Sequence, residues 1–81
     1  MTARQPVTYA VLAFGTTHAA LSAERVLLDS GVPLTPIPTP KTRGELCGIA
    51  LRILPADEPR AREILGDAGI EIRARAEIDD V

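Results

Sequence analysis

The chain of 81 residues contains one cysteine, Cys47, which is the residue best suited to covalent chemistry. A cysteine thiolate is a strong nucleophile and can take up a sulfur or selenium atom. Cys47 opens an apolar run, and Gly48 after it would let a partner approach the backbone closely. A lone cysteine on an apolar strand is also commonly a small buried hydrophobe, so a reactive and a structural interpretation both stand on the residues alone.

Two cations precede Cys47 in a polar loop that is rich in turn-forming residues. Lys41 and Arg43 favour the thiolate over the thiol, whereas Glu45 opposes it. We therefore list Lys41 and Arg43, with Gly48, as candidate binding residues. The alternative is that the two cations belong to a solvated turn.

A second polar group follows the first apolar segment. Thr16 or Thr17 is placed to cap a helix, and the N-terminus of a helix can bind an anion. His18 is a candidate proton shuttle beside Cys47, although a histidine after a helix cap is commonly exposed. No third residue orients such a pair, which argues against a hydrolytic triad. Cys47 and His18 are too few for a closed metal site, so we predict no metal and no cofactor.

Composition restricts the class of protein. A hydrophobic share of 46% favours one folded domain, over residues 1–81 with an ordered core over 7–78. The net charge of −2 gives no electrostatic footprint for nucleic acid. The longest apolar stretch, residues 9–14, is too short to cross a bilayer. One cysteine cannot form an internal disulfide, which favours the reducing cytoplasm.

Hydrophobic periodicity and turn residues predict four strands and two helices. The first and third strands are apolar on both faces, the second contains prolines, and the last alternates apolar and charged residues. One helix lies between Thr16 and Gly31, and the other between Asp57, which caps it, and Gly69. The predicted strands cover residues 7–14, 32–37, 47–54 and 70–78.

This order of elements predicts an α+β, ferredoxin-like βαββαβ fold, a two-layer sandwich with two helices on one face. The antiparallel sheet has the order 4-1-3-2, because the doubly apolar strands suit its centre and the others its edges. Arg73 and Arg75 then protect an edge against aggregation. The end of the first strand meets the start of the third at one rim, which places Cys47 beside residues 15–18.

Two segments, residues 10–24 and residues 37–51, carry a resemblance. They resemble a family of short, largely uncharacterised bacterial proteins described as selenium/sulfur-carrier-like, in which a Pro-x-Pro loop leads to Cys-Gly. Here these residues are Pro38, Pro40, Cys47 and Gly48. The resemblance implies that Cys47 holds a persulfide or selenopersulfide between a protein donor and a protein acceptor. Residues 42–46 depart from the serine-rich approach to the cysteine in other members.

A carrier or accessory protein fits this sequence better than a stand-alone enzyme does. The alternative function is a non-catalytic interaction module that docks to a larger enzyme through its sheet face, and a small-molecule sensor is a third interpretation. We also predict a homodimer formed through the sheet face opposite the helices. Either set of side chains on the first strand leaves apolar residues there, with Gly48, Ala50 and Leu54 facing outward.

Overall fold

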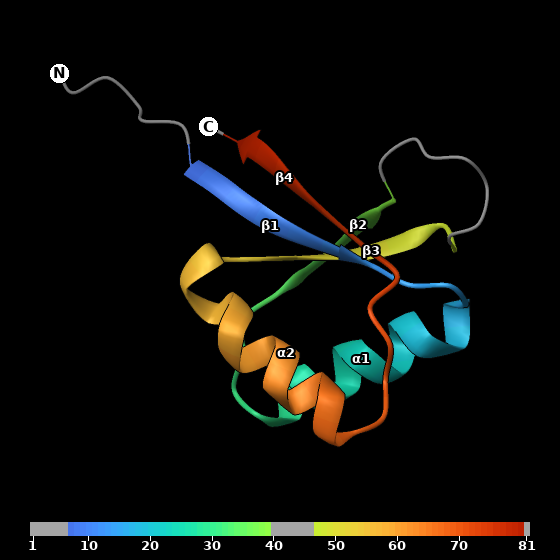
Figure 1. Cartoon of the computed structure of the whole chain (residues 1–81). Helices are drawn as coiled ribbons and strands as arrows, with labels where there is room; N and C mark the ends of the chain where they lie inside the picture. Colours follow the sequence, from blue (N-terminus) through green and yellow to red (C-terminus); the bar gives the residue numbers. More distant parts are fainter. Residues whose placement is uncertain (1–6, 40–46, 81) are drawn as a thin grey trace, which may run out of the picture.

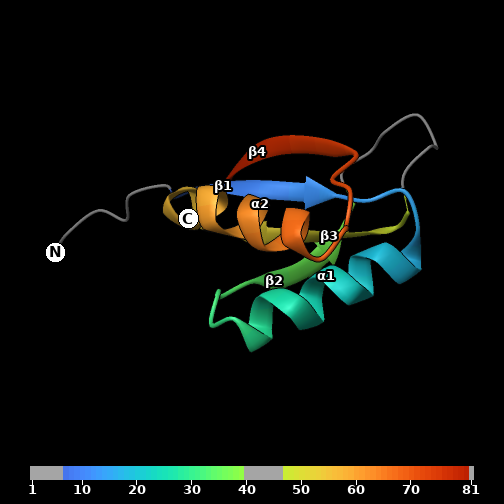
Figure 2. The same cartoon turned by 60° about the horizontal axis from the view of Figure 1, so that its bottom comes forward.

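The computed structural model describes residues 7–39 and 47–80 of the chain. Both helices cover one face of a four-stranded antiparallel sheet (Figures 1 and 2). The helices in the described part of the chain are too short and too polar to cross a membrane. The elements are β1 (Val7–Ala13), α1 (Thr17–Asp29), β2 (Thr35–Pro38), β3 (Ile49–Ile53), a 3₁₀ turn (Pro55–Asp57), α2 (Glu58–Asp67) and β4 (Ala74–Asp80).

The strand order is β2-β3-β1-β4, which is the predicted order counted from the other edge. β2 contains Pro36 and Pro38, which lack a backbone N–H, and within the sheet it pairs only with β3. β1 is flanked on both sides, by β3 and by β4. The apolar pattern of β1 and β3 and the prolines of β2 therefore predicted the order of the sheet correctly.

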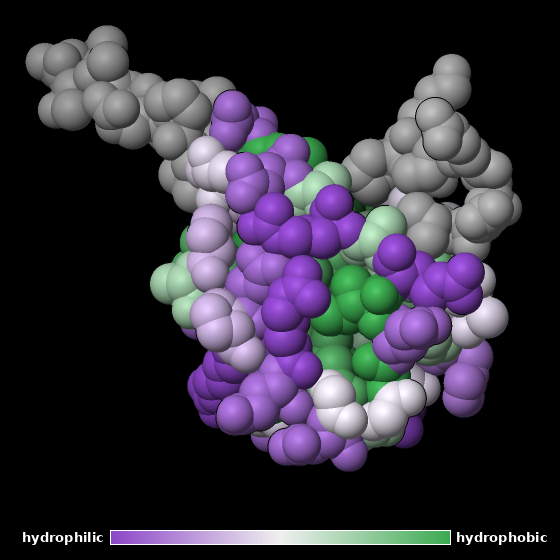
Figure 3. Space-filling view, viewed as in Figure 1, coloured by the Kyte–Doolittle hydropathy of each residue, from purple (hydrophilic) through white to green (hydrophobic). Residues whose placement is uncertain are grey.

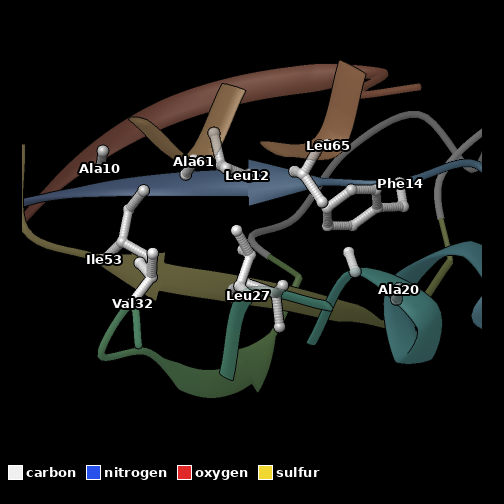
Figure 4. Close-up of a cluster of buried hydrophobic side chains, with 11 residues drawn as sticks. Ala10, Leu12, Phe14, Ala20, Leu27, Val32, Ile53, Ala61 and Leu65 are labelled. Carbon is white, nitrogen blue, oxygen red and sulfur yellow. The ribbon is translucent and has the colours of Figure 1, made fainter. Parts of the chain in front are cut away.

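The main core lies between the sheet and the two helices. Ala10 and Leu12 of β1, and Phe14 directly after it, point toward the helices and are fully buried. Figure 4 shows Phe14 pointing into this cluster next to Leu65 of α2, with Ala20 of α1 nearby. Small alanines on the helices let the helices approach the sheet closely, so one aromatic ring and a few leucines fill the space.

The opposite face of the sheet corrects one prediction. Of the two sets of side chains left open for the first strand, the one with Val11 and Ala13 points away from the helices, but these two residues are only 1% and 4% exposed. Ala50, predicted to face outward, is 0% exposed. The flanking side chains that pack against these three residues are Ile37, Ala74, Ala76 and Ile78. The centre of this face is therefore buried within the single chain, and the apolar patch on which we based self-association is smaller than predicted.

The last strand begins four residues later than the predicted strand and ends at Asp80. Ile70 and Ile72 pack against the helix-side core, whereas Ala74 and Ala76 pack on the opposite face. The change of face occurs at Arg73, whose N–H bonds to the carbonyl of Ala13, 2.9 Å away, outside the register of the ladder. In Figure 3, apolar surface follows the segment between α2 and β4.

The helix ends follow their predicted signals in part. The hydroxyl of Thr16 accepts the N–H of Ala19 at 3.0 Å, which caps α1, and Gly31 after it has a φ of +80°. Gly69 follows α2 with a φ of +73°. Asp57 occupies the cap position of α2 but its side chain makes no capping hydrogen bond, because the 3₁₀ turn leads directly into the helix. Asp57 is therefore the N-cap residue as predicted, but its side chain satisfies none of the free N–H groups of the helix.

An ion-pair cluster ties the start of α2 to β4. Glu58 accepts from Arg75 Nε at 2.7 Å and Nη2 at 2.8 Å, and from Arg62 Nε at 3.0 Å. The Glu58 side chain is 12% exposed. The hydrogen bond from Arg75 lowers the pKa of Glu58 below its ordinary value of 4.5, with a smaller contribution from Arg62. Arg75, predicted to protect the edge, instead holds α2 against the sheet.

We expect this cluster to stabilise the fold above pH 4.5 and to lose its effect as the pH falls through the lowered pKa of Glu58, because the unfolded chain then takes up the proton first. Glu58→Gln should lower the melting temperature at pH 7 by roughly 5 °C, the change that about 1 kcal/mol makes in a small domain. At pH 3 the difference from wild type should shrink. The matched control is Glu63→Gln, at an exposed position of the same helix. An equal loss in both variants would contradict this account.

Candidate functional site

The main chain at Cys47 is held from both sides. Its N–H donates to the carbonyl of Phe14 at 2.9 Å, which joins it to the end of the first strand. On the other side, the Thr39 hydroxyl donates to the carbonyl of Cys47 at 2.7 Å, and the Thr39 N–H donates to the carbonyl of Gly48 at 3.0 Å. The predicted meeting of the first and third strands at one rim is therefore confirmed, and the backbone of the site is fixed.

The side chain of Cys47 is half-buried and packs against the helix-side core. Its thiol donates to the carbonyl of Ile49 at 3.2 Å. A carbonyl oxygen can only accept a hydrogen bond, so the thiol proton lies between the two atoms in this conformer. To react as a nucleophile, the sulfur must leave this contact by rotation about the Cα–Cβ bond.

Gly48 is exposed, and the fold of this chain does not require a glycine there. Its φ is not in the left-handed region, and a methyl group built on it would meet no atom within 4 Å. Gly31 and Gly69, by contrast, have positive φ values. The position after Cys47 thus has open space that a larger side chain could fill.

The other predicted site residues are only partly brought to Cys47. Thr16 is the helix cap and lies two residues after Phe14, whereas Thr17 is the exposed first residue of α1. His18 is exposed and lines a surface hollow with Leu21 and other side chains of α1. No hydrogen bond joins His18 to Cys47 in the described ranges, so the geometry gives the proton-shuttle hypothesis no support. Lys41 and Arg43 lie outside the described residues.

The sequence family described as "Putative Se/S carrier protein-like" matches residues 9–77 of this chain. The chain belongs to this family. No curated protein and no solved structure matches the chain. The matched range contains β3, both helices, and β1 from Tyr9 onward.

In this Se/S carrier-like chain a further cation, Arg73, lies at the same end of β1, where the sequence pattern did not predict it. The Arg73 side chain lies across Gly15, where a methyl group would come within 3.3 Å of its Nη1. Arg73 bonds through its backbone to Ala13, and Cys47 bonds to the next residue from the opposite side of the strand. The alternation of apolar and charged residues predicted only that Arg73 lies on an edge strand. The residue types give no sign that the chain changes face in this segment.

Metal ligands are not gathered in this Se/S carrier-like chain over residues 7–39 and 47–80. No group of three histidine, cysteine, aspartate or glutamate side chains in these ranges is placed to hold an ion. Cys47 is the only cysteine of the chain. Any covalent transfer of sulfur or selenium through a thiol in this protein must therefore use Cys47.

Proposed function

We propose that this protein carries sulfur or selenium on Cys47 as a persulfide or selenopersulfide. The observation that carries the proposal is a half-buried thiol on a fixed backbone, the only thiol in a chain of a Se/S carrier-like family. The order of elements and strands supports assigning it to the ferredoxin-like folds, and a free thiol suits the reducing cytoplasm.

The proposed transfer moves one sulfur atom without net oxidation. The Cys47 thiolate attacks the terminal sulfur of a persulfide on a donor protein. A new S–S bond forms at Cys47, the donor's S–S bond breaks, and the donor thiolate leaves with the electron pair. Delivery reverses the roles: a nucleophile on the acceptor attacks the terminal sulfur, and Cys47 leaves as the thiolate.

A non-catalytic module would not need an open approach to Cys47, whereas a carrier does. Since the fold does not require a glycine at position 48, we infer that Gly48 serves the donor or acceptor protein, which must bring its own sulfur against this strand.

Gly48→Ala should therefore leave the stability of the isolated chain unchanged or slightly raised, because the new methyl group enters open space. The rate of loading by a protein persulfide donor should fall by roughly tenfold, since about 1.4 kcal/mol of lost contact in the complex changes a rate by that factor. Loading by a small persulfide such as cysteine persulfide should change little. An equal rate with the protein donor would contradict the role of Gly48.

The function itself is tested by incubating the chain with a cysteine desulfurase and cysteine, then separating the two proteins and measuring bound sulfane sulfur. The proposal predicts stable, reductant-sensitive sulfur on this chain. A chain that acquires none from a protein donor or from a small persulfide would favour the accessory module.

A further inference from the structure

β4 forms one edge of the sheet and pairs with β1 alone among the described strands. In Figure 2 no described element lies beyond it. The strand has seven residues, Ala74–Asp80, and contains no proline. A regular edge strand of this length presents unpaired backbone groups that can bind another strand.

The charges nearest to Ala76 are arranged symmetrically about it. Arg75 of the strand and Arg73, directly before the strand, precede Ala76, and Glu77 and Asp79 follow it. The ladder places Arg75, Glu77 and Asp79 on the helix side, because Arg75 lies opposite Leu12 and Glu77 opposite Ala10, both in the helix-side core. These charged residues are exposed. A second β4 running antiparallel therefore presents the complementary charges to the first.

We infer that two copies of this chain pair edge to edge through β4, around a twofold axis at Ala76. Arg75, which bonds Glu77 of its own chain at 2.9 Å, then also lies opposite Glu77 of the other copy. Arg73, directly before the strand, comes level with Asp79 of the other copy. The two sheets join into one continuous antiparallel sheet, with the helices of both copies on the same face. Directly opposed opposite charges stabilise such a pair, and like charges destabilise it.

Other registers are less favourable. A twofold axis at Arg75 opposes two arginines, and one at Glu77 opposes two glutamates. A shift that places the axis between residues would set a charged side chain of one copy opposite an alanine of the other that points to the other face. The strand is thus complementary to its own antiparallel copy in one register, which commits this edge to a second copy rather than to an unrelated strand.

Nothing in this pairing occupies Cys47. The cysteine flanks β1 on its β3 side, whereas the paired edge lies beyond β1 on the other side. The antiparallel arrangement places the two Cys47 rims at opposite ends of the paired strands. The inference therefore stands whether or not Cys47 carries sulfur.

Crosslinking tests the register. Residues directly opposite in an antiparallel pair have Cα atoms about 4.5–5.5 Å apart, within the range that a disulfide bridges. In the Cys47→Ser background, Ala76→Cys should form a covalent dimer in oxidised glutathione. Ala74→Cys should not, because the same residues of the two copies are then roughly 13 Å apart along the strands. Failure of Ala76→Cys to crosslink, or equal crosslinking at position 74, would overturn the register.

Charge exchange tests the pairing. Arg73→Asp and Asp79→Arg should each weaken self-association about tenfold or more, since each creates two like-charge pairs by symmetry. An equimolar mixture of the two variants should recover dimers, because every pair is again of opposite charge. The readout is sedimentation velocity, after circular dichroism has shown both variants folded. A monomeric wild type at high micromolar concentration, or a mixture no stronger than either variant, would refute the inference.

Discussion

Replacing Cys47 with serine should abolish the loading of sulfane sulfur and leave the fold in place. A hydroxyl cannot form a persulfide, and the chain has no other cysteine. The hydrogen bonds that hold this segment use the backbone of Cys47, not its sulfur, and the serine hydroxyl can donate to Ile49 as the thiol does. We therefore expect unfolding to change by less than about 1 kcal/mol, while loading falls to background.

The measurement combines sulfane-sulfur analysis after reaction with a persulfide donor and urea unfolding of the same preparations. Cys47→Ala serves as a second variant, because it removes the sulfur without adding a hydroxyl. Loading that survives in both variants would show that sulfur is held elsewhere. Unfolding of both variants would give Cys47 a packing role and would remove the main support for the carrier.

The second large effect is expected at Phe14, the only phenylalanine of the chain. Its side chain is 0% exposed, is the largest of the fully buried side chains, and lies against residues of both helices in Figure 4. Phe14→Ala should cost about 3–5 kcal/mol, from lost burial and the cavity left behind. A chain of this length has a total stability of only about 4–12 kcal/mol. A large share of the Phe14→Ala molecules should therefore be unfolded at about 37 °C.

Urea unfolding followed by circular dichroism checks this expectation, with Leu28→Ala as the matched control. Leu28 is 51% exposed on α1, and its truncation should change stability by about 0.5 kcal/mol or less. Since the carbonyl of Phe14 anchors the N–H of Cys47, Phe14→Ala should also loosen the site and speed alkylation of the thiol in the folded fraction. Similar losses at Phe14 and Leu28 would contradict the described core.

The sheet order and the place of Cys47 could be predicted because each rests on a local signal. Prolines exclude β2 from the sheet centre, and apolar residues on both faces bring β1 and β3 there. Once the order is known, the antiparallel pairing of β1 and β3 must bring Phe14 and Cys47 to the same rim.

The predictions that failed concern segments in which tertiary contacts override the alternation of apolar and polar residues. The alternation from Ile70 to Ile78 is unbroken in sequence, yet Ile72 and Ala74 pack on opposite faces of the sheet. The same change of face brings Arg73 to Gly15. Spacing within one helix or one strand cannot show the pairing of Glu58 with Arg75, because the two residues come from different elements.

The mass of the intact wild-type protein tests the carrier most directly. After incubation with a cysteine desulfurase and cysteine, and without reductant, the account predicts a species heavier by about 32 Da for each added sulfur atom. Digestion should locate the added mass on the peptide that contains Cys47, and dithiothreitol should remove it. A protein that keeps its unmodified mass while the desulfurase itself becomes persulfidated would contradict the proposal that Cys47 carries sulfur.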